Sequence, residues 1–202
     1  VAETGLTLET ITAEEEAGLA LKGCLPLIDQ GAPHALVFDI GGGSTEVMLM
    51  DTRNGAADMT GWVSLPFGVV NLSERYGGGT LSVPVYDAMV AEVDKYLSPF
   101  CERHGVSALV GRGEAQLLGT SGTVTTLTGV HLDLPRYDRS VVDGAYLDFD
   151  DIRVMSDQLR GQDCADRAAH PCIGADRADL VVAGCAILEA ICRRWPIGRL
   201  RV

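Results

Sequence analysis

The chain has 202 residues, of which 47% are hydrophobic, and a formal net charge of −12. This length suits one domain or one and a half, and the apolar fraction is large enough for a sizeable core. No apolar run reaches the ~18 residues of a membrane-spanning helix, so no membrane span is expected. The acidic balance argues against nucleic acid as the main partner. An anionic ligand would need a local cluster of donors and cations.

The six cysteines contain no CxxC pair, and Cys185 and Cys192 are spaced like two thiols on one buried face of a helix. Val1–Glu9 lacks the basic start of a secretory signal. We therefore expect a reduced, cytoplasmic protein. The chain does not begin with Met, which suggests a piece of a longer protein.

The first part of the chain predicts a strand and a helix before the sheet begins. Leu6–Ile11 alternates in the manner of a short strand. Thr12–Lys22 is predicted as a helix, because Thr12-x-x-Glu15 is a capping box. The acids at positions 14–16 also suit the positive end of a helix dipole.

The rest of the chain alternates strands and helices. Leu36–Phe38 and Val47–Met50 flank a glycine turn, Thr60–Leu65 is a third strand, and Asn54-Gly55 is a strong turn signal before it. Two later strands are expected at 116–118 and 199–202. Helical periodicity predicts further helices at Val69–Tyr76, Pro84–His104, Thr123–Val130, Phe149–Leu159, Asp163–Ala169 and Ala175–Arg194. This order predicts an α/β protein with a mixed, five-stranded sheet.

The stretch Asp39-Ile40-Gly41-Gly42-Gly43-Ser44-Thr45-Glu46 carries the strongest chemical signal. Its glycines permit positive φ and let a ligand approach the main chain. Backbone N–H groups in such a turn can hold phosphate oxygens, and the two carboxylates can hold a divalent cation on that phosphate. The alternative is an ordinary glycine-rich hairpin turn, which is the commoner case for such a turn taken alone.

A second turn of the same composition, Gly119-Thr120-Ser121-Gly122-Thr123, also follows a predicted strand. Two such turns facing each other can grip a phosphate chain from both sides, as in the actin-like ATPase and sugar kinase superfamily. The first turn is not a P-loop, since no Gly-Lys-Ser/Thr follows it, and a dinucleotide fingerprint would need glycine where Glu46 stands.

These two turns and the acidic segment Ile11–Ala17 closely resemble the exopolyphosphatase / guanosine pentaphosphate phosphohydrolase (Ppx/GppA) family. Ser64–Tyr76 and Arg177–Gly184 extend the resemblance over nearly the whole chain. It implies a ribonuclease H-like fold of the actin-like ATPase superfamily, with helices on both faces of the sheet. Residues 1–35 would be a junction strand and an acidic helix from the interlobe region. Residues 36–202 would be the second ribonuclease H-like lobe, truncated at its last strand.

The resemblance also implies roles for individual residues. Glu16 matches the glutamate that activates water, although Glu15 could take its place, and Asp39 and Glu46 match acids linked to Mg²⁺. The implied phosphate-binding residues are Gly41, Gly42, Gly43, Ser44, Thr45, Gly119, Thr120, Ser121, Gly122 and Thr123. The chain departs from the family where Gly18 replaces a frequent arginine and Ser121 a frequent glycine.

The implied activity is release of terminal orthophosphate from inorganic polyphosphate by metal-assisted attack of water. Removal of the 5′ γ-phosphate of pppGpp, or a non-catalytic sensor of polyphosphate or nucleotide, are the alternatives. An ATPase or sugar kinase of the same superfamily is disfavoured. The full-length protein is expected to be a homodimer, and the 202 residues alone to fold without much activity. Four cations could guide the anion or simply lie on the surface: Lys22, Arg75, Arg136 and Arg139.

Overall fold

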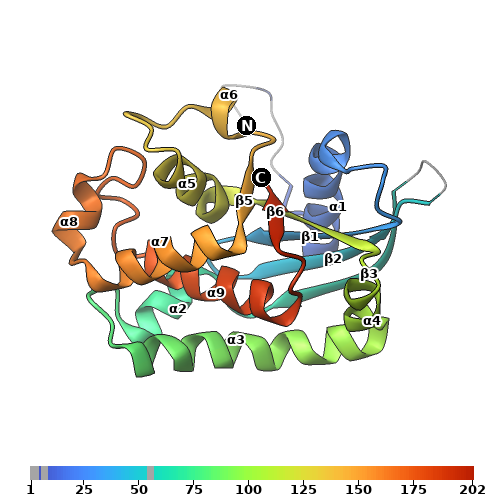
Figure 1. Cartoon of the computed structure of the whole chain (residues 1–202), viewed down its shortest axis with the longest axis horizontal. Helices are drawn as coiled ribbons and strands as arrows, with labels where there is room; N and C mark the ends of the chain where they lie inside the picture. The colour runs from blue at the N-terminus through green and yellow to red at the C-terminus, as the bar shows by residue number, and fades with distance from the viewer. Residues whose placement is uncertain (1–4, 6–8, 54–56) are drawn as a thin grey trace.

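A mixed sheet with helices on both faces forms the centre of the computed structural model, which describes Gly5 and residues 9–53 and 57–202 (Figure 1). The strand order is β3-β2-β1-β4-β6-β5. The strands are β1 His34–Ile40, β2 Thr45–Asp51, β3 Asp58–Leu65, β4 Ala115–Thr120, β5 Tyr146–Asp148 and β6 Arg199–Arg201. The α/β class and the mixed sheet are therefore confirmed, whereas the expected strand number of five is corrected to six.

The strand that the sequence missed is β5, which pairs antiparallel with β6 at the edge of the sheet. It has 3 residues, which is too short to give a clear alternation of apolar and polar side chains. β1, β2 and β3 form an antiparallel meander, and β4 lies parallel to β1 on the other side. Because β1 and β4 run in the same direction, their carboxyl-terminal ends lie side by side at one end of the sheet.

The helices are close to the predicted ranges, with one shift. They are α1 Ala13–Cys24, α2 Val69–Tyr76, α3 Val83–His104, α4 Val106–Gly111, α5 Ser121–His131, α6 Arg139–Val142, α7 Phe149–Gly161, α8 Cys164–Ala169 and α9 Val181–Arg194, with a 3₁₀ turn at Leu25–Leu27. Residues 175–180 form turns rather than the first part of α9, so the predicted helix start at Ala175 is wrong. The short helices α4 and α6 were not predicted, because fewer than two turns show little periodicity.

Two predictions fall wholly or partly outside the described residues. Asn54-Gly55 lies outside them, and so do residues 6–8 of the expected first strand, while Glu9–Ile11 form no strand. The capping box at the start of α1 is confirmed, since the Thr12 hydroxyl accepts from the Glu15 amide and the Glu15 carboxylate accepts from the Thr12 amide. No helix in the described ranges joins the length and the apolar character needed to cross a lipid bilayer.

The pleat of β1 divides its side chains between two cores. Leu36, Phe38 and Ile40 face the larger core, which α3 and α9 cover, whereas Ala35 and Val37 face a smaller core beneath α1. Because side chains alternate along a strand, the next residue on the α1 side is Asp39. Burying each large apolar side chain contributes roughly 1.5–3 kcal/mol, so this register is strongly fixed.

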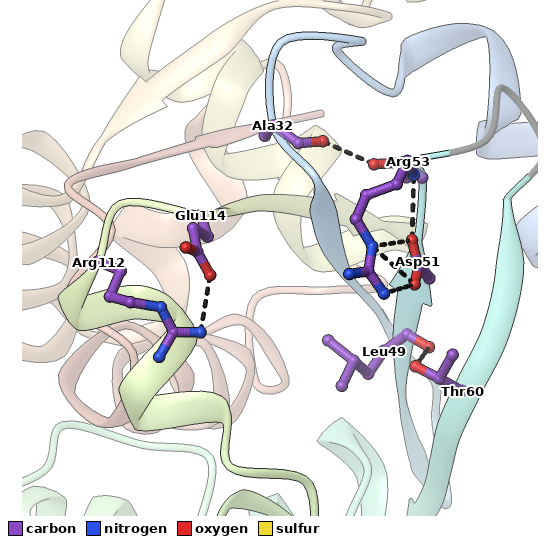
Figure 2. Close-up of polar contacts among 8 residues, drawn as sticks. Ala32, Leu49, Asp51, Arg53, Thr60, Arg112 and Glu114 are labelled. Carbon is purple, nitrogen blue, oxygen red and sulfur yellow. Dashed lines mark hydrogen bonds and ion pairs between the residues drawn. The ribbon is translucent and has the colours of Figure 1, made fainter.

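Polar contacts close the end of the meander that lies opposite the glycine turn (Figure 2). Arg53 forms an ion pair with Asp51 at the end of β2, and Arg112 forms one with Glu114 just before β4, at 2.7 Å. The Thr60 hydroxyl donates to the Leu49 carbonyl across β2 and β3, at 3.2 Å. The acids labelled at this end are thus each matched by an arginine.

Candidate functional site

The first turn of α2 supports the glycine turn between β1 and β2. The amides of Val69 and Val70 donate to the carbonyls of Gly41 and Gly42, at 3.0 and 2.8 Å. The Asn71 side chain donates to the Gly43 carbonyl at 2.8 Å. The carbonyl side of the turn is therefore satisfied from within the protein.

The amide side of the same turn is left open. The Gly41 amide donates to the Ser44 carbonyl at 3.0 Å, but the amides of Gly42, Gly43 and Ser44 have no hydrogen-bond partner among the described residues. Successive N–H groups that lack a partner form a concavity suited to an anion. The local structure thus presents donors outward while its acceptors are occupied.

Gly68 allows α2 to come this close. A Cβ atom added to Gly68 would lie 2.3 Å from the carbonyl carbon and oxygen of Gly42 and 2.4 Å from the Gly43 nitrogen. These neighbours are backbone atoms that cannot move aside independently. Only glycine therefore permits the contact that holds the turn.

The second turn meets the first at the edge of the sheet. Thr120, the last residue of β4, pairs with Asp39 in the parallel register of β1 and β4. The Ser121 hydroxyl then donates to the Ile40 carbonyl at 2.8 Å. Ser121 has φ of 80°, in the left-handed region that favours glycine, and it begins α5. The free amides of the first turn of α5 and its dipole face the same edge.

Two adjoining cavities lie along these turns. A cavity of 260 Å³ is lined by both turns and by the segment before α9, including Gly41, Gly42, Ser121, Gly122 and Thr123. A larger cavity of 620 Å³ lies between α1 and the loop at 137–143, and Asp39, Gly119 and Thr120 belong to its lining. Ser121, Gly122 and Arg177 line both. The two predicted turns are thus brought together around one continuous hollow region.

Arg177 was not among the predicted site residues. Its guanidinium lies 3.6 Å from where a Cβ of Gly122 would be, and it donates to the Thr126 hydroxyl at 2.8 Å. The described residues show no ion pair for this arginine. The sequence signal was available, because Arg177 opens one of the segments that carry the family resemblance.

Three acids face each other on the α1 side of the sheet. Asp39 and Glu46 are direct cross-strand partners, and Glu46 is 5% exposed, with the Ser64 hydroxyl donating to it at 2.8 Å. Burial raises the pKa of Asp39, and the negative charges of Glu46 and Glu16 raise it further. A hydrogen bond from Ser121 opposes this rise in the pKa of Asp39. The charge of Glu16 in α1 thus acts on Asp39 at the end of β1.

The pair of Asp39 and Glu46 fits a shared ion better than a closed metal site. No group of three or more His, Cys, Asp or Glu side chains in the described ranges could hold a metal by itself. Mg²⁺ commonly takes one or two carboxylates and completes its shell with phosphate oxygens and water. None of the ion pairs among the described residues includes Asp39 or Glu46, so no basic side chain of the protein matches their charge.

Some predicted residues serve the fold instead of lining the cavities. Thr45 is fully buried, and its hydroxyl donates to the Phe67 carbonyl at 2.7 Å. Gly119 lies against the Phe38 ring, which is 2.5 Å from where its Cβ would be, although its backbone borders the larger cavity. Gly43 and Ser44 line neither cavity.

Of the four cations considered as guides for an anion, one lines a cavity at the glycine turns and three do not. Arg139 lines the larger cavity. Lys22 and Arg136 line neither of the two cavities at the turns. Arg75 is paired with Glu92 and lies over the Phe67 ring, so its charge is already matched.

Two glycine-containing turns that meet at one edge of a mixed sheet, with helices on both faces, define an α/β protein of the actin-like ATPase class, as the sequence predicted. The structure of the Aquifex aeolicus PPX-GPPA enzyme superimposes with a TM-score of 0.83 at 25% identity, covering 99% of this chain and 62% of that one. Residues 1–202 match the Ppx/GppA phosphatase family, and the chain belongs to it.

Curated relatives share this family resemblance. Exopolyphosphatase 2 of Mycobacterium tuberculosis is 28% identical over 190 residues, covering 94% of this chain and 56% of that protein. The guanosine-5′-triphosphate,3′-diphosphate pyrophosphatase of Photobacterium profundum is 30% identical over 129 residues, covering 63% of this chain and 24% of that protein. The chain thus spans little more than half the length of the first of these relatives and about a quarter of the second.

Proposed function

We propose that this chain is part of a hydrolase that releases terminal orthophosphate from inorganic polyphosphate. The observation that carries the proposal is the open amide side of the glycine turn, next to the cross-strand pair of carboxylates Asp39 and Glu46. The relative that matches over most of the chain is named as an exopolyphosphatase, which favours this substrate. The pyrophosphatase name of the shorter match keeps pppGpp as the alternative.

The phosphate chain would be held by backbone donors and one arginine. The Gly42 amide faces the smaller cavity from one side, with the open amides of Gly43 and Ser44 next to it in the chain, and the first turn of α5 lines the cavity from the other side. Arg177 adds a positive charge where both cavities meet. Such local donors are needed because the chain as a whole carries a net charge of −12.

Asp39 and Glu46 would hold Mg²⁺, which supplies charge neutralisation to the terminal phosphates when it is bound. Glu16 would orient the attacking water and accept its proton on a carboxylate oxygen. The hydrogen bonds of Glu15 to Thr12 favour Glu16 for this role, because Glu15 is already engaged in capping α1. Those bonds also lower the pKa of Glu15, which makes it a weaker base.

The proposal is tested by phosphate release from the full-length protein with long-chain polyphosphate, pppGpp and ATP in parallel. We expect polyphosphate to be the best substrate. Preference for pppGpp would support the alternative, and binding without release from any of the three would instead support a sensor.

The metal role has a readout besides activity. Mg²⁺ should raise the thermal unfolding temperature of the wild-type protein, because it relieves repulsion between Asp39 and Glu46. The increase should be largely lost in Asp39→Asn. An equal increase in both proteins would remove Asp39 from the metal site.

We also propose a reducing compartment and a homodimer for the full-length protein. Six free cysteines suit a cytoplasmic protein. The dimer can be checked by sedimentation of the full-length protein.

A further inference from the structure

Arg167, in α8, is a fully buried cation in the part of the chain that the structure describes, with 0% of its surface exposed. None of the ion pairs among the described residues includes it. Its Nε donates to the Asp163 carbonyl at 3.2 Å and its Nη2 to the Gly78 carbonyl at 2.8 Å, while Nη1 has no partner. A buried guanidinium without a carboxylate is costly, so an apolar side chain would serve stability better. Its presence calls for a different explanation.

The carbonyl that Arg167 holds belongs to the loop between α2 and α3. The Cys164 thiol donates to the same Gly78 carbonyl at 3.2 Å, so two side chains of α8 converge on one backbone oxygen. The guanidinium also lies 3.5 Å from that thiol. Gly78 is therefore fixed by α8 rather than by its neighbours in the chain.

Gly78 in turn lies so close to the segment that precedes α9 that a side chain would not fit between them. A Cβ at Gly78 would lie 2.7 Å from the Asp179 carbonyl oxygen and 2.8 Å from the Asp179 Cβ. From α2, the Ser73 hydroxyl donates to the same Asp179 carbonyl at 2.8 Å. The backbone at Asp179 is thus hydrogen-bonded to α2 and closely approached by Gly78.

Arg177 is two residues before this fixed point. Its carbonyl accepts from the amides of Leu180 and Val181, at 3.0 and 2.9 Å, so the intervening turn is tightly hydrogen-bonded. A shift at Asp179 would therefore move the Arg177 guanidinium relative to Gly122, which it approaches, and to the Thr126 hydroxyl, to which it donates.

We propose that Arg167 is a positioning residue for Arg177, acting through Gly78 and Asp179. Its charge holds the Gly78 carbonyl, Gly78 limits the position of Asp179, and this places the Arg177 guanidinium over the second glycine turn. The inference rests on the proposed function, in which Arg177 binds substrate phosphate.

Arg167→Met in the full-length protein tests this inference, because Met keeps apolar volume and removes the buried charge. The KM for polyphosphate should rise about tenfold, since a small misplacement of a binding group is enough for such a loss. The kcat should stay within about twofold. The thermal unfolding temperature should not fall, and Arg167→Lys should recover part of the lost affinity. An unchanged KM would overturn the inference.

Arg160→Met is the matched control. Arg160 also donates from a neighbouring segment to the loop after α2, to the Leu81 carbonyl at 3.1 Å. Leu81 lies beyond the residue that touches Asp179, so this variant should leave KM unchanged. An equal rise of KM in both variants would show general loosening of the loop and would contradict a specific role for Arg167.

A double-mutant cycle separates this inference from the proposed function. Arg177→Met alone should raise KM, and adding Arg167→Met to it should have little further effect. If Arg177→Met leaves KM unchanged, the phosphate-binding role of Arg177 fails. If it raises KM but the two effects multiply independently, only the positioning role fails. Should Arg167→Met not fold, Ser73→Ala decides, with the same expected coupling to Arg177→Met.

Discussion

The acidic residues at the two ends of the β1–β2 hairpin have pKa values shifted in opposite directions. At the end away from the glycine turn, a hydrogen-bonded arginine lowers the pKa of Asp51, and Arg112 does the same for Glu114. At the glycine turn, burial and two neighbouring carboxylates raise the pKa of Asp39. At the first end each acid is paired with an arginine, whereas at the glycine turn no basic side chain among the described residues is paired with Asp39 or Glu46.

This difference separates structural acids from site acids. Exposed acid–arginine pairs stabilise the fold only slightly and need no ligand. Buried or half-buried carboxylates that repel each other are tolerated where a bound ion or substrate later compensates them. The glycine turn therefore stands out by its unmatched charge as well as by its motif.

The largest expected effect is on the chemical step. Glu16→Gln should lower the rate of phosphate release by roughly 10²–10⁴, because the amide cannot accept a proton from water. The unfolding temperature should not fall, because the variant removes a negative charge that acts on Asp39. Glu14→Gln, at another acid in the first turn of α1, is the control and should keep nearly full activity. A fully active Glu16→Gln protein would remove Glu16 from catalysis.

The next largest effect is on stability, when the contact between α2 and the glycine turn is disrupted. Gly68→Ala should reduce the free energy of unfolding by about 1–3 kcal/mol, because its Cβ would collide with the Gly42 backbone. Gly43→Ala is the matched control, since its Cβ would meet no atom within 4 Å. Urea denaturation of both variants measures the difference. Equal stability would show that α2 does not hold the turn.

A smaller effect is expected at the second turn. Ser121→Ala should cost about 1 kcal/mol, because the hydrogen bond to the Ile40 carbonyl is lost while the strained backbone remains. Ser121→Gly loses the same bond but relieves a left-handed conformation worth about 1–2 kcal/mol. It should therefore be at least as stable as the wild type by chemical denaturation, and a lower stability than Ser121→Ala would contradict this account.

The smallest expected effects have opposite signs at the two ends. When the pKa of an acid is higher in the folded than in the unfolded protein, the free energy of unfolding decreases as pH rises from the unfolded to the folded pKa. Asp39→Asn should therefore stabilise the protein at pH 7, and this gain should vanish at pH values below the unfolded pKa of about 4.

Asp51→Asn should change the stability in the opposite direction. The lowered pKa of Asp51 contributes stability above the unfolded pKa, and this contribution is lost as pH falls through the folded pKa. The variant should be slightly less stable than wild type at pH 7, and the difference should shrink as pH falls below the unfolded pKa of about 4. Thermal melts of both variants between pH 2 and 8 test the pair, and shifts of the same sign would contradict the comparison.

Local patterns in the sequence determined most of the architecture. The capping box fixed the start of α1, alternation and periodicity placed the long elements, and the two glycine turns together indicated the region of the site. The strand β5 and the helices α4 and α6 escaped prediction because elements this short give only a weak periodic signal. The start of α9 was misplaced because the apolar spacing continues through turns at 175–180.

Only the tertiary structure decided how individual side chains are used. It buries the Thr45 hydroxyl against Phe67, turns Ser121 into a left-handed conformation, and brings Arg177 to the second turn from far along the chain. The physical reason is that these outcomes depend on packing between distant segments, such as Gly68 on Gly42, whereas propensity and spacing describe only neighbours in the chain.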